Sequence, residues 1–368
     1  MYPALAIRQA LGNDANPILW VGSEGGMEAD LVQRAGMSFT AIPSGQVAGM
    51  GLRIIPNLVK VIQGTLVSQR ILNDFKPDVL LFTGGYVAVP MALAGRNIPS
   101  LVYVPDIEPG IALKLMARFA SIIGLTSENS RQYFPNSAHT EITGYPIRAD
   151  LKGWTREKAL AHLGLNPDRF ILLVTGGSSG ARSLNRALLA ALPDLLHEIQ
   201  IIHLIGKLDW AEVQAALPSL TSEMAENYHP LPYLHEMGAA LAAADLVISR
   251  AGASTLGELP LFGLPAILVP YPHAWRYQKV NADYLIERGA ALMIEDAKLP
   301  EMILTAVLTL SRDPDRLQRM RQAMQSLVQP QAGQRLADII RELAKGPSMR
   351  KKSTGHLEDT SSGENLHG

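Results

Sequence analysis

Short apolar runs alternate with helix-like stretches along almost the whole chain. The runs are continuous rather than alternating, and several stop at glycine, which is typical of buried parallel strands joined by crossover helices. In the first half, the predicted strands are residues 18–22, 78–85, 99–104, 121–126 and 140–143. In the second half, they are residues 170–174, 200–205, 246–249 and 266–269. The pattern therefore predicts an α/β protein in which a parallel sheet is built twice.

The break between the two halves falls near residues 144–166, where a polar helix is predicted at residues 156–163. The 368 residues also suit about two domains of ordinary size. We therefore predict two Rossmann-like domains, residues 1–150 and 151–345, with a cleft between their sheets, because open α/β sheets bind ligands at the carboxyl ends of their strands. Residues 346–368 are rich in Ser, Gly and charge and offer no apolar pattern to pack, so we predict a disordered tail.

Composition excludes several classes of protein. Hydrophobic residues make up 47% and charged residues 18%, as in ordinary globular proteins. The 33 basic and 34 acidic residues leave a net charge of −1, so no overall positive field attracts nucleic acid. The absence of cysteine excludes disulfides, cysteine-ligated metals and a thiol nucleophile. Because no apolar run approaches the roughly 18 residues of a membrane-spanning helix, we expect a soluble protein, at most peripheral to a membrane.

The sharpest motif is the Gly-Gly-Ser-Ser-Gly turn at residues 176–180, which follows a predicted strand and opens a predicted helix. Glycines such as Gly177 let the backbone approach a ligand closely, and the first turn of the helix offers free N–H groups to an anion. No Gly-Lys-Ser/Thr follows, so this is not a Walker A motif and γ-phosphate transfer is disfavoured. A plain tight turn would explain part of the pattern, but the whole string favours phosphate binding.

A second strand-to-helix junction, residues 249–258, carries small and polar residues. One interpretation is a helix cap in which Thr255 and Glu258 form a capping box. The other places Ser254 and Thr255 beside a diphosphate, with Glu258 accepting hydrogen bonds from two ribose hydroxyls, because a carboxylate offers two acceptor oxygens. The residues alone leave both interpretations open.

Gln278 and Arg148 complete the candidate site. Gln278 follows the strand at 266–269 and its Pro-rich loop, and its amide both donates to and accepts from sugar hydroxyls. Arg148 should face the cleft and would donate to a phosphate, although the sequence pattern is equally compatible with an isolated, exposed arginine. A single loop histidine, His273, is more typical of a structural contact than of a base. No His, Asp or Glu cluster has metal-ligand spacing, so we expect neither a metal nor a cofactor.

Taken in this order and spacing, the motifs resemble the lipid II-forming N-acetylglucosaminyltransferases of bacteria, which are peripheral membrane enzymes of the two-Rossmann GT-B fold. The resemblance runs from Met1 to about Leu343. It is carried by residues 2–6, 27–32, 76–79, 84–87, 144–148, 176–182, 249–253 and 263–266.

The resemblance implies transfer of GlcNAc from UDP-GlcNAc to the C4 hydroxyl of undecaprenyl-diphospho-muramoyl-pentapeptide in peptidoglycan synthesis. The reaction inverts the anomeric centre, needs no metal in the chemistry, and takes place on the cytoplasmic side of the cell membrane. By position, the implied substrate contacts are Ser178 and Ser179 on the diphosphate, Leu234 at the uracil, Ala253, Ser254 and Thr255 near the phosphates, Glu258 at the ribose, Gln278 on the GlcNAc hydroxyls, and Arg148 on the wall of the cleft.

The chain departs from the family pattern at three places. The family begins with a strand and a Gly-Gly-Thr-Gly-Gly-His loop, and the histidine of this loop, the expected general base, directly precedes the residue that matches Met1. We expect an in-frame upstream sequence to encode this segment. The alternative is a truncated, inactive protein. Residues 104–109 replace the usual Glu-Gln-Asn, and residues 275–278 lack an acidic residue and a second Gln. These last two changes leave the sugar and the acceptor open and the UDP assignment intact.

Two apolar and basic stretches, residues 52–62 and 114–119, would supply membrane contact, and ordinary core helices would look the same. The alternative functions are a UDP-sugar:diacylglycerol glycosyltransferase, a non-hydrolytic sugar epimerase, and an inactive nucleotide-sugar-binding homologue. Analysis of which acceptor is used would distinguish the diacylglycerol glycosyltransferase. The epimerase would need no lipid at all, and the inactive homologue would bind UDP-GlcNAc without turnover.

Overall fold

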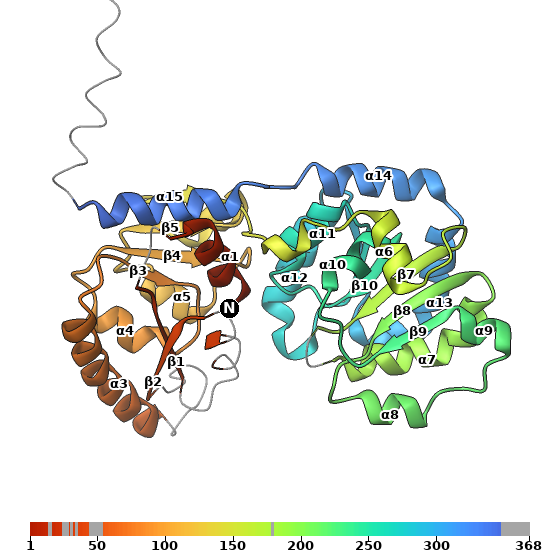
Figure 1. The fold of residues 1–368 in the computed structure, drawn as a ribbon, viewed down its shortest axis with the longest axis horizontal. Coiled ribbons are helices and arrows are strands. Elements are labelled where there is room, and N and C mark those ends of the chain that lie inside the picture. The colour runs from red at the N-terminus through yellow and green to blue at the C-terminus, as the bar shows by residue number, and fades with distance from the viewer. Residues whose placement is uncertain are drawn as a thin grey trace, which may run out of the picture.

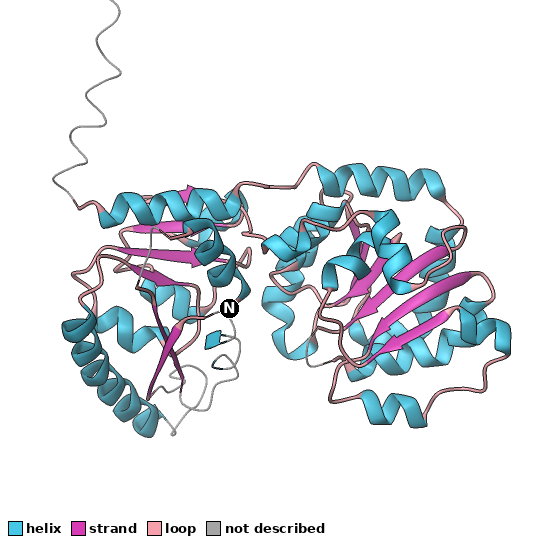
Figure 2. Ribbon diagram, viewed as in Figure 1, coloured by secondary structure: helices cyan, strands magenta, loops and turns pink. Residues whose placement is uncertain are grey.

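A computed structural model of the chain describes residues 1–13, 17–23, 29, 32–33, 36–43, 54–177 and 180–346. The described residues form two α/β units that lie side by side (Figure 1; Figure 2). Every strand pairing is parallel, as the apolar runs predicted, and the α/β class with two Rossmann-like sheets is confirmed. Within these residues no helix is both long enough and apolar enough to cross a membrane.

The first unit holds two separate parallel sheets among its described residues. One pairs β1 (Leu19–Ser23) with β2 (Ser38–Ile42), and the other runs in the order β3 (Leu80–Phe82), β4 (Ser100–Val104), β5 (Ile122–Leu125) and β6 (Thr140–Ile142). Its helices, including short 3₁₀ helices labelled η, are α1 (Tyr2–Leu11), α3 (Ile54–Phe75), α4 (Ala88–Ala94), α5 (Ile111–Met116), η2 (Glu128–Tyr133) and η3 (Ala149–Leu151).

The second unit is built on a six-stranded parallel sheet in the order β12-β11-β10-β7-β8-β9. The strands are β7 (Phe170–Thr175), β8 (Ile199–Leu204), β9 (Tyr228–Leu231), β10 (Leu246–Ser249), β11 (Ala266–Leu268) and β12 (Ala291–Met293). The helices after the first unit are α6 (Arg156–Leu163), α7 (Arg182–Leu196), α8 (Trp210–Ala215), α9 (Ser222–Glu226), α10 (Met237–Ala243), α11 (Thr255–Phe262), η4 (Pro272–Ala274), α12 (Trp275–Ile286), η5 (Asp296–Lys298), α13 (Leu299–Ser311), α14 (Pro314–Gln325) and α15 (Ala332–Ala344).

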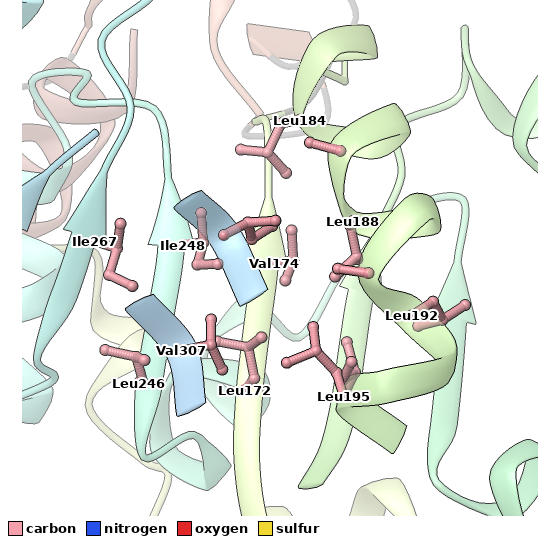
Figure 3. Close-up of a cluster of buried hydrophobic side chains, with 14 of the residues drawn as sticks. Leu172, Val174, Leu184, Leu188, Leu192, Leu195, Leu246, Ile248, Ile267 and Val307 are labelled. Atoms are coloured by element: carbon pink, nitrogen blue, oxygen red, sulfur yellow. The ribbon is translucent and has the colours of Figure 1, made fainter. Parts of the chain in front are cut away.

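Alternation along β7 builds a core on each face of this sheet. Leu172 and Val174 point into one apolar cluster, and Ile171 and Leu173 point into the other, as successive strand residues must. On the first side the leucines of α7 recur every three or four positions and face the sheet, together with Val307 of α13 (Figure 3). Full burial of each such side chain contributes roughly 1.5–3 kcal/mol. The sheet is therefore firmly packed on both of its faces.

The last helix, α15, packs against the first unit rather than the second (Figure 1). Leu336 is fully buried among residues of α1 and of the strands β4 and β5. Gly124 on β5 makes this close approach possible, because a Cβ there would lie 2.8 Å from Leu336 Cδ2. The division at residue 150 stays a prediction, and the packing adds that the chain returns to the first unit at its last described helix. From residue 347 the predicted tail lies outside the described residues.

Candidate functional site

A cavity of about 800 Å³ opens at the carboxyl ends of the second sheet's strands. Thr175, Leu204 and Ser249, the last residues of β7, β8 and β10, lie on its wall. Tyr2 and Arg148 reach the same wall from the first unit. The cavity is therefore formed by both units, at the edge where open α/β sheets bind ligands.

Most of the site residues predicted from the sequence meet in this cavity. The wall includes Arg148, Gly177, Leu234, Ser254, Thr255, Glu258 and Gln278. Ala253 is not on the wall, although its neighbours Gly252 and Ser254 are. Ser178 and Ser179 lie outside the described residues. The structure thus brings together residues from both halves of the chain, and their roles toward a substrate stay predictions.

The glycine-rich turn is shaped by backbone that only glycine adopts easily. Gly177 has φ +87° and Gly180 has φ +83°, in the region that L side chains rarely enter. The turn delivers the chain to α7, whose N-cap residue Ala181 provides no side-chain cap. The first-turn N–H groups of α7 consequently lack a side-chain acceptor there, and residues 180–183 line the cavity. This is the arrangement in which a helix start receives an anion.

Arg250 is a cavity residue that the sequence reasoning quoted but did not select. Its Nη1 donates to Asp296 Oδ1 at 2.5 Å and its Nη2 to Ser183 Oγ at 2.8 Å, while Ser183 Oγ also donates to Asp296 at 2.8 Å. The guanidinium stacks near the Tyr271 ring, 5.4 Å from its centroid. Arg250 thus ties the start of α7 to η5 and places a fixed cation on the wall. Its position directly after a strand was the available signal.

Among the cavity residues, Glu258 has the pKa that departs most from its ordinary value. Burial raises its pKa from the ordinary 4.5 to about 7, against the opposing influence of the Arg148 cation and of a hydrogen bond with Ser254. The capping-box interpretation is wrong, because the Thr255 hydroxyl donates to the Gly252 carbonyl at 2.6 Å and Ser254, the N-cap of α11, provides no side-chain cap. Glu258 thus lies on the cavity wall with its carboxylate hydrogen-bonded by Ser254 rather than engaged in a capping box.

Arg148 carries positive charge to the cavity from the first unit. Its guanidinium carbon lies 4.5 Å from the centroid of the Tyr2 ring, and its Nη1 lies 3.4 Å from Asp150 Oδ2. Its Nε is buried and has no hydrogen-bond partner in the described structure. Arg148 is thus held by an aromatic face and one carboxylate, with donor capacity left for an anion.

Gln278 is partly engaged by the loop before it. Its Oε1 accepts a hydrogen bond from the Tyr271 backbone N–H at 2.8 Å, so the amide group that remains for a ligand is the NH₂ donor. His273 lies in η4, outside the cavity wall, with its ring against that of Tyr271. Within the described residues no group of three His, Asp or Glu side chains is placed to hold a metal ion.

Both units match domains of one glycosyltransferase family. Residues 1–124 match the glycosyltransferase family 28 N-terminal domain, and residues 171–343 match the glycosyltransferase family 28 C-terminal domain. A Roseiflexus protein named UDP-N-acetylglucosamine--N-acetylmuramyl-(pentapeptide) pyrophosphoryl-undecaprenol N-acetylglucosamine transferase is 38% identical, over 88% of this chain and 83% of its own. The Desulforudis audaxviator protein of the same name is 39% identical, over 94% of this chain and 95% of its own length.

Solved structures agree with the sequence relatives. MurG of Acinetobacter baumannii superimposes with a TM-score of 0.74 at 28% identity, over 93% of this chain and 95% of its own. A UDP-GlcNAc 2-epimerase from Neisseria meningitidis has a TM-score of 0.64 at 12% identity, over 93% of this chain and 96% of its own. At this identity the similarity is one of fold alone. The two-domain GT-B architecture is therefore confirmed.

Proposed function

Because the chain belongs to the family of UDP-N-acetylglucosamine--N-acetylmuramyl-(pentapeptide) pyrophosphoryl-undecaprenol N-acetylglucosamine transferases, we propose that it transfers GlcNAc from UDP-GlcNAc to a polyprenyl-diphosphate-linked muramoyl pentapeptide, the step from lipid I to lipid II in peptidoglycan synthesis. The observation that carries the proposal is the cavity at the carboxyl edge of the second sheet. It combines an uncapped helix start, fixed arginines and one partly buried carboxylate.

The donor would bind with its diphosphate at the start of α7. The first-turn N–H groups of that helix would provide the donors, and Arg250, whose charge Asp296 compensates, holds Ser183 of that turn in place. Glu258 would accept hydrogen bonds from the two ribose hydroxyls. Leu234 lies on the same wall, where its backbone would meet the uracil, and the NH₂ group of Gln278 would donate to a GlcNAc hydroxyl.

In the transfer, the C4 hydroxyl oxygen of the acceptor forms a bond to C1 of GlcNAc from the face opposite the diphosphate. The C1–O bond to the diphosphate breaks, and UDP leaves with the bonding electrons. Negative charge grows on the departing diphosphate, and donors already fixed in position stabilise that charge without having to reorganise. The base that takes the hydroxyl proton stays unassigned among the described residues.

The acceptor's lipid places the reaction at a membrane surface, so we propose peripheral association on the cytoplasmic side. The names of the relatives specify an undecaprenol-linked acceptor. On the first unit, Val59, Ile62 and Leu66 of α3 are 47%, 55% and 63% exposed, and their spacing of three and four puts them on one helix face. Ile111, the first residue of α5, and Phe119, just after that helix, are also exposed; Phe119 belongs to the second predicted membrane stretch and Ile111 precedes it.

The test is a transfer assay with defined substrates. The chain would be incubated with UDP-GlcNAc and detergent-solubilised undecaprenyl-diphospho-muramoyl-pentapeptide, and the lipid product analysed by mass spectrometry. The expected product is the lipid-linked disaccharide, with one UDP released per disaccharide formed. Parallel reactions with diacylglycerol and with no acceptor test the two alternative enzymes. UDP-GlcNAc binding without any product would instead favour the binding-only homologue.

A further inference from the structure

One fully buried side chain, Asn281 on α12, joins the two units next to the cavity loop at residues 251–255. Its Nδ2 donates to Asp106 Oδ1 at 2.8 Å and to the Ala251 carbonyl at 3.1 Å, and its Oδ1 accepts from the Ile107 backbone N–H at 3.0 Å. Its two amide protons are therefore both used, one toward each unit. A buried amide satisfied in this way fixes its three partners relative to one another.

The second-unit partner of Asn281 belongs to the cavity loop. Ala251 directly precedes Gly252, and Gly252, Ser254 and Thr255 lie on the cavity wall. Because a trans peptide is planar, the carbonyl of Ala251 and the N–H of Gly252 point in opposite directions. An anion that binds the Gly252 N–H would polarise this peptide group and strengthen its carbonyl as the acceptor for Asn281.

The first-unit partners belong to the loop between β4 and α5. Next to Asp106 and Ile107, the Glu108 carboxylate receives Arg276 through both oxygens, at 3.0 Å from Nε and 2.5 Å from Nη2. Arg276 and Asn281 both lie on α12, and the cavity residue Gln278 lies between them. The helix that carries Gln278 is thus fastened to the first unit on both sides of that residue.

From this geometry we propose that Asn281 is a positioning residue that couples the donor cavity to the first unit: donor occupancy at the 251–255 loop is transmitted through its amide to the 106–108 loop of the first unit. This inference rests on the proposed function, since it requires a UDP-sugar in the cavity. A bond made only between units would hold them together, whereas Asn281 also holds the cavity loop. Coupling of this kind needs a contact that both sites affect.

The experiment measures hydrogen exchange in the segment containing the Ile107 amide, with and without saturating UDP. In the native chain, UDP should slow exchange there by about fivefold or more. Asn281→Ala removes all three bonds and should abolish the UDP effect. Asp106→Ala removes only one and should reduce it, whereas Asp106→Asn retains an acceptor oxygen and should preserve it. If Asn281→Ala fails to fold, the difference in the UDP effect between Asp106→Ala and Asp106→Asn still tests the proposal.

A matched control removes a different bond between the units. Arg288 Nη2 donates to Asn129 Oδ1 at 3.2 Å without touching the cavity loop, so Arg288→Ala should leave the UDP effect intact. Loss of the effect in this control, or its survival in Asn281→Ala, would overturn the inference. Calorimetry on the same samples reports UDP binding itself. Absence of UDP binding to the native chain would overturn the proposed function, and this inference with it.

Discussion

Glu258 gives the cavity a pH dependence whose sign differs between ligand binding and folding. Its pKa of about 7 means that the carboxylate loses its charge as the pH falls through neutrality. If the carboxylate accepts the ribose hydroxyls, UDP affinity should fall as the pH is lowered from 8 to 6. Glu258→Ala should weaken UDP binding by about 1–3 kcal/mol at pH 8, because donors lose their partner. Calorimetric titration across that pH range measures both effects.

The raised pKa of Glu258 affects folding stability in the opposite direction from ligand binding. Between the ordinary 4.5 and about 7, the folded chain holds a proton on Glu258 that the unfolded chain has released. The contribution of Glu258 to the free energy of unfolding therefore falls as the pH rises through this window. Glu258→Gln, which cannot ionise, should remove that slope. Unchanged UDP affinity in Glu258→Ala would argue against the ribose contact, and an unchanged slope in Glu258→Gln against the raised pKa.

Gln278 allows the sugar contact to be separated from a structural one. Its Oε1 holds the Tyr271 N–H, and only its NH₂ group remains to donate to a sugar hydroxyl. Gln278→Glu keeps an acceptor for Tyr271 but loses the donor. We expect UDP-GlcNAc to bind this variant about tenfold more weakly while UDP binds nearly as before, a loss of about 1.4 kcal/mol. Equal losses for both ligands, measured by calorimetry, would refute the sugar role. Gln278→Ala serves as the comparison that loses both contacts.

At the scale of elements, the strand-to-helix turn before α7 places different constraints on two of its three glycines, Gly177 and Gly180. Both have positive φ, which costs an L residue about 1–2 kcal/mol. A Cβ on Gly177 would meet nothing within 4 Å, whereas one on Gly180 would lie 2.6 Å from the Ile205 carbonyl oxygen. Gly180→Ala should therefore lower the free energy of unfolding clearly more than Gly177→Ala. Urea titration of the two variants measures the difference, and equal losses would mean that φ alone matters.

Strands with a strong apolar signal were predictable, and the weaker ones were not. The run at residues 246–249 became β10 without change, and the helix at 156–163 became α6. β2, β9 and β12 were missed, and β9 and β12 are the edge strands of the second sheet. β9 contains Pro230, which has no N–H to donate, and an edge position is where a sheet tolerates it. β9 and β12 are both buried less completely than the central strands β7 and β10, and neither carries a long continuous apolar run.

At the scale of the whole molecule, contacts between the units leave no local trace in the sequence. Asp106 and Glu108 stand out only as two acidic residues in a Pro-flanked loop, which is too little for a metal site. Their actual partners, Asn281 and Arg276, lie 175 and 168 residues away. Several cavity residues were easier to predict, because they follow predicted strands and carry chemistry suited to a phosphate or a sugar, whereas Leu234 was implied only by the family resemblance. Pairing between distant loops depends on how the two units meet, which periodicity does not encode.

The return of α15 to the first unit predicts which unit its core residues stabilise. Leu336 on α15 and Leu310 on α13 are both 0% exposed, but one packs with α1 and β4 and the other with α7. Replacing either by Ala should cost about 2–5 kcal/mol. If α15 belongs to the first unit, Leu336→Ala should speed hydrogen exchange in β4 and β5 while sparing β7 and β8.

Leu310→Ala is the matched control, because it should do the reverse: faster exchange in β7 and β8 and little change in β4. Two units joined in one chain need not unfold in a single transition, so exchange resolved by segment is more informative than one melting midpoint. Faster exchange throughout both units in either variant would mean that they unfold together. In that case the contacts across the cleft, with Asn281 at their centre, would bind the two sheets into one cooperative structure.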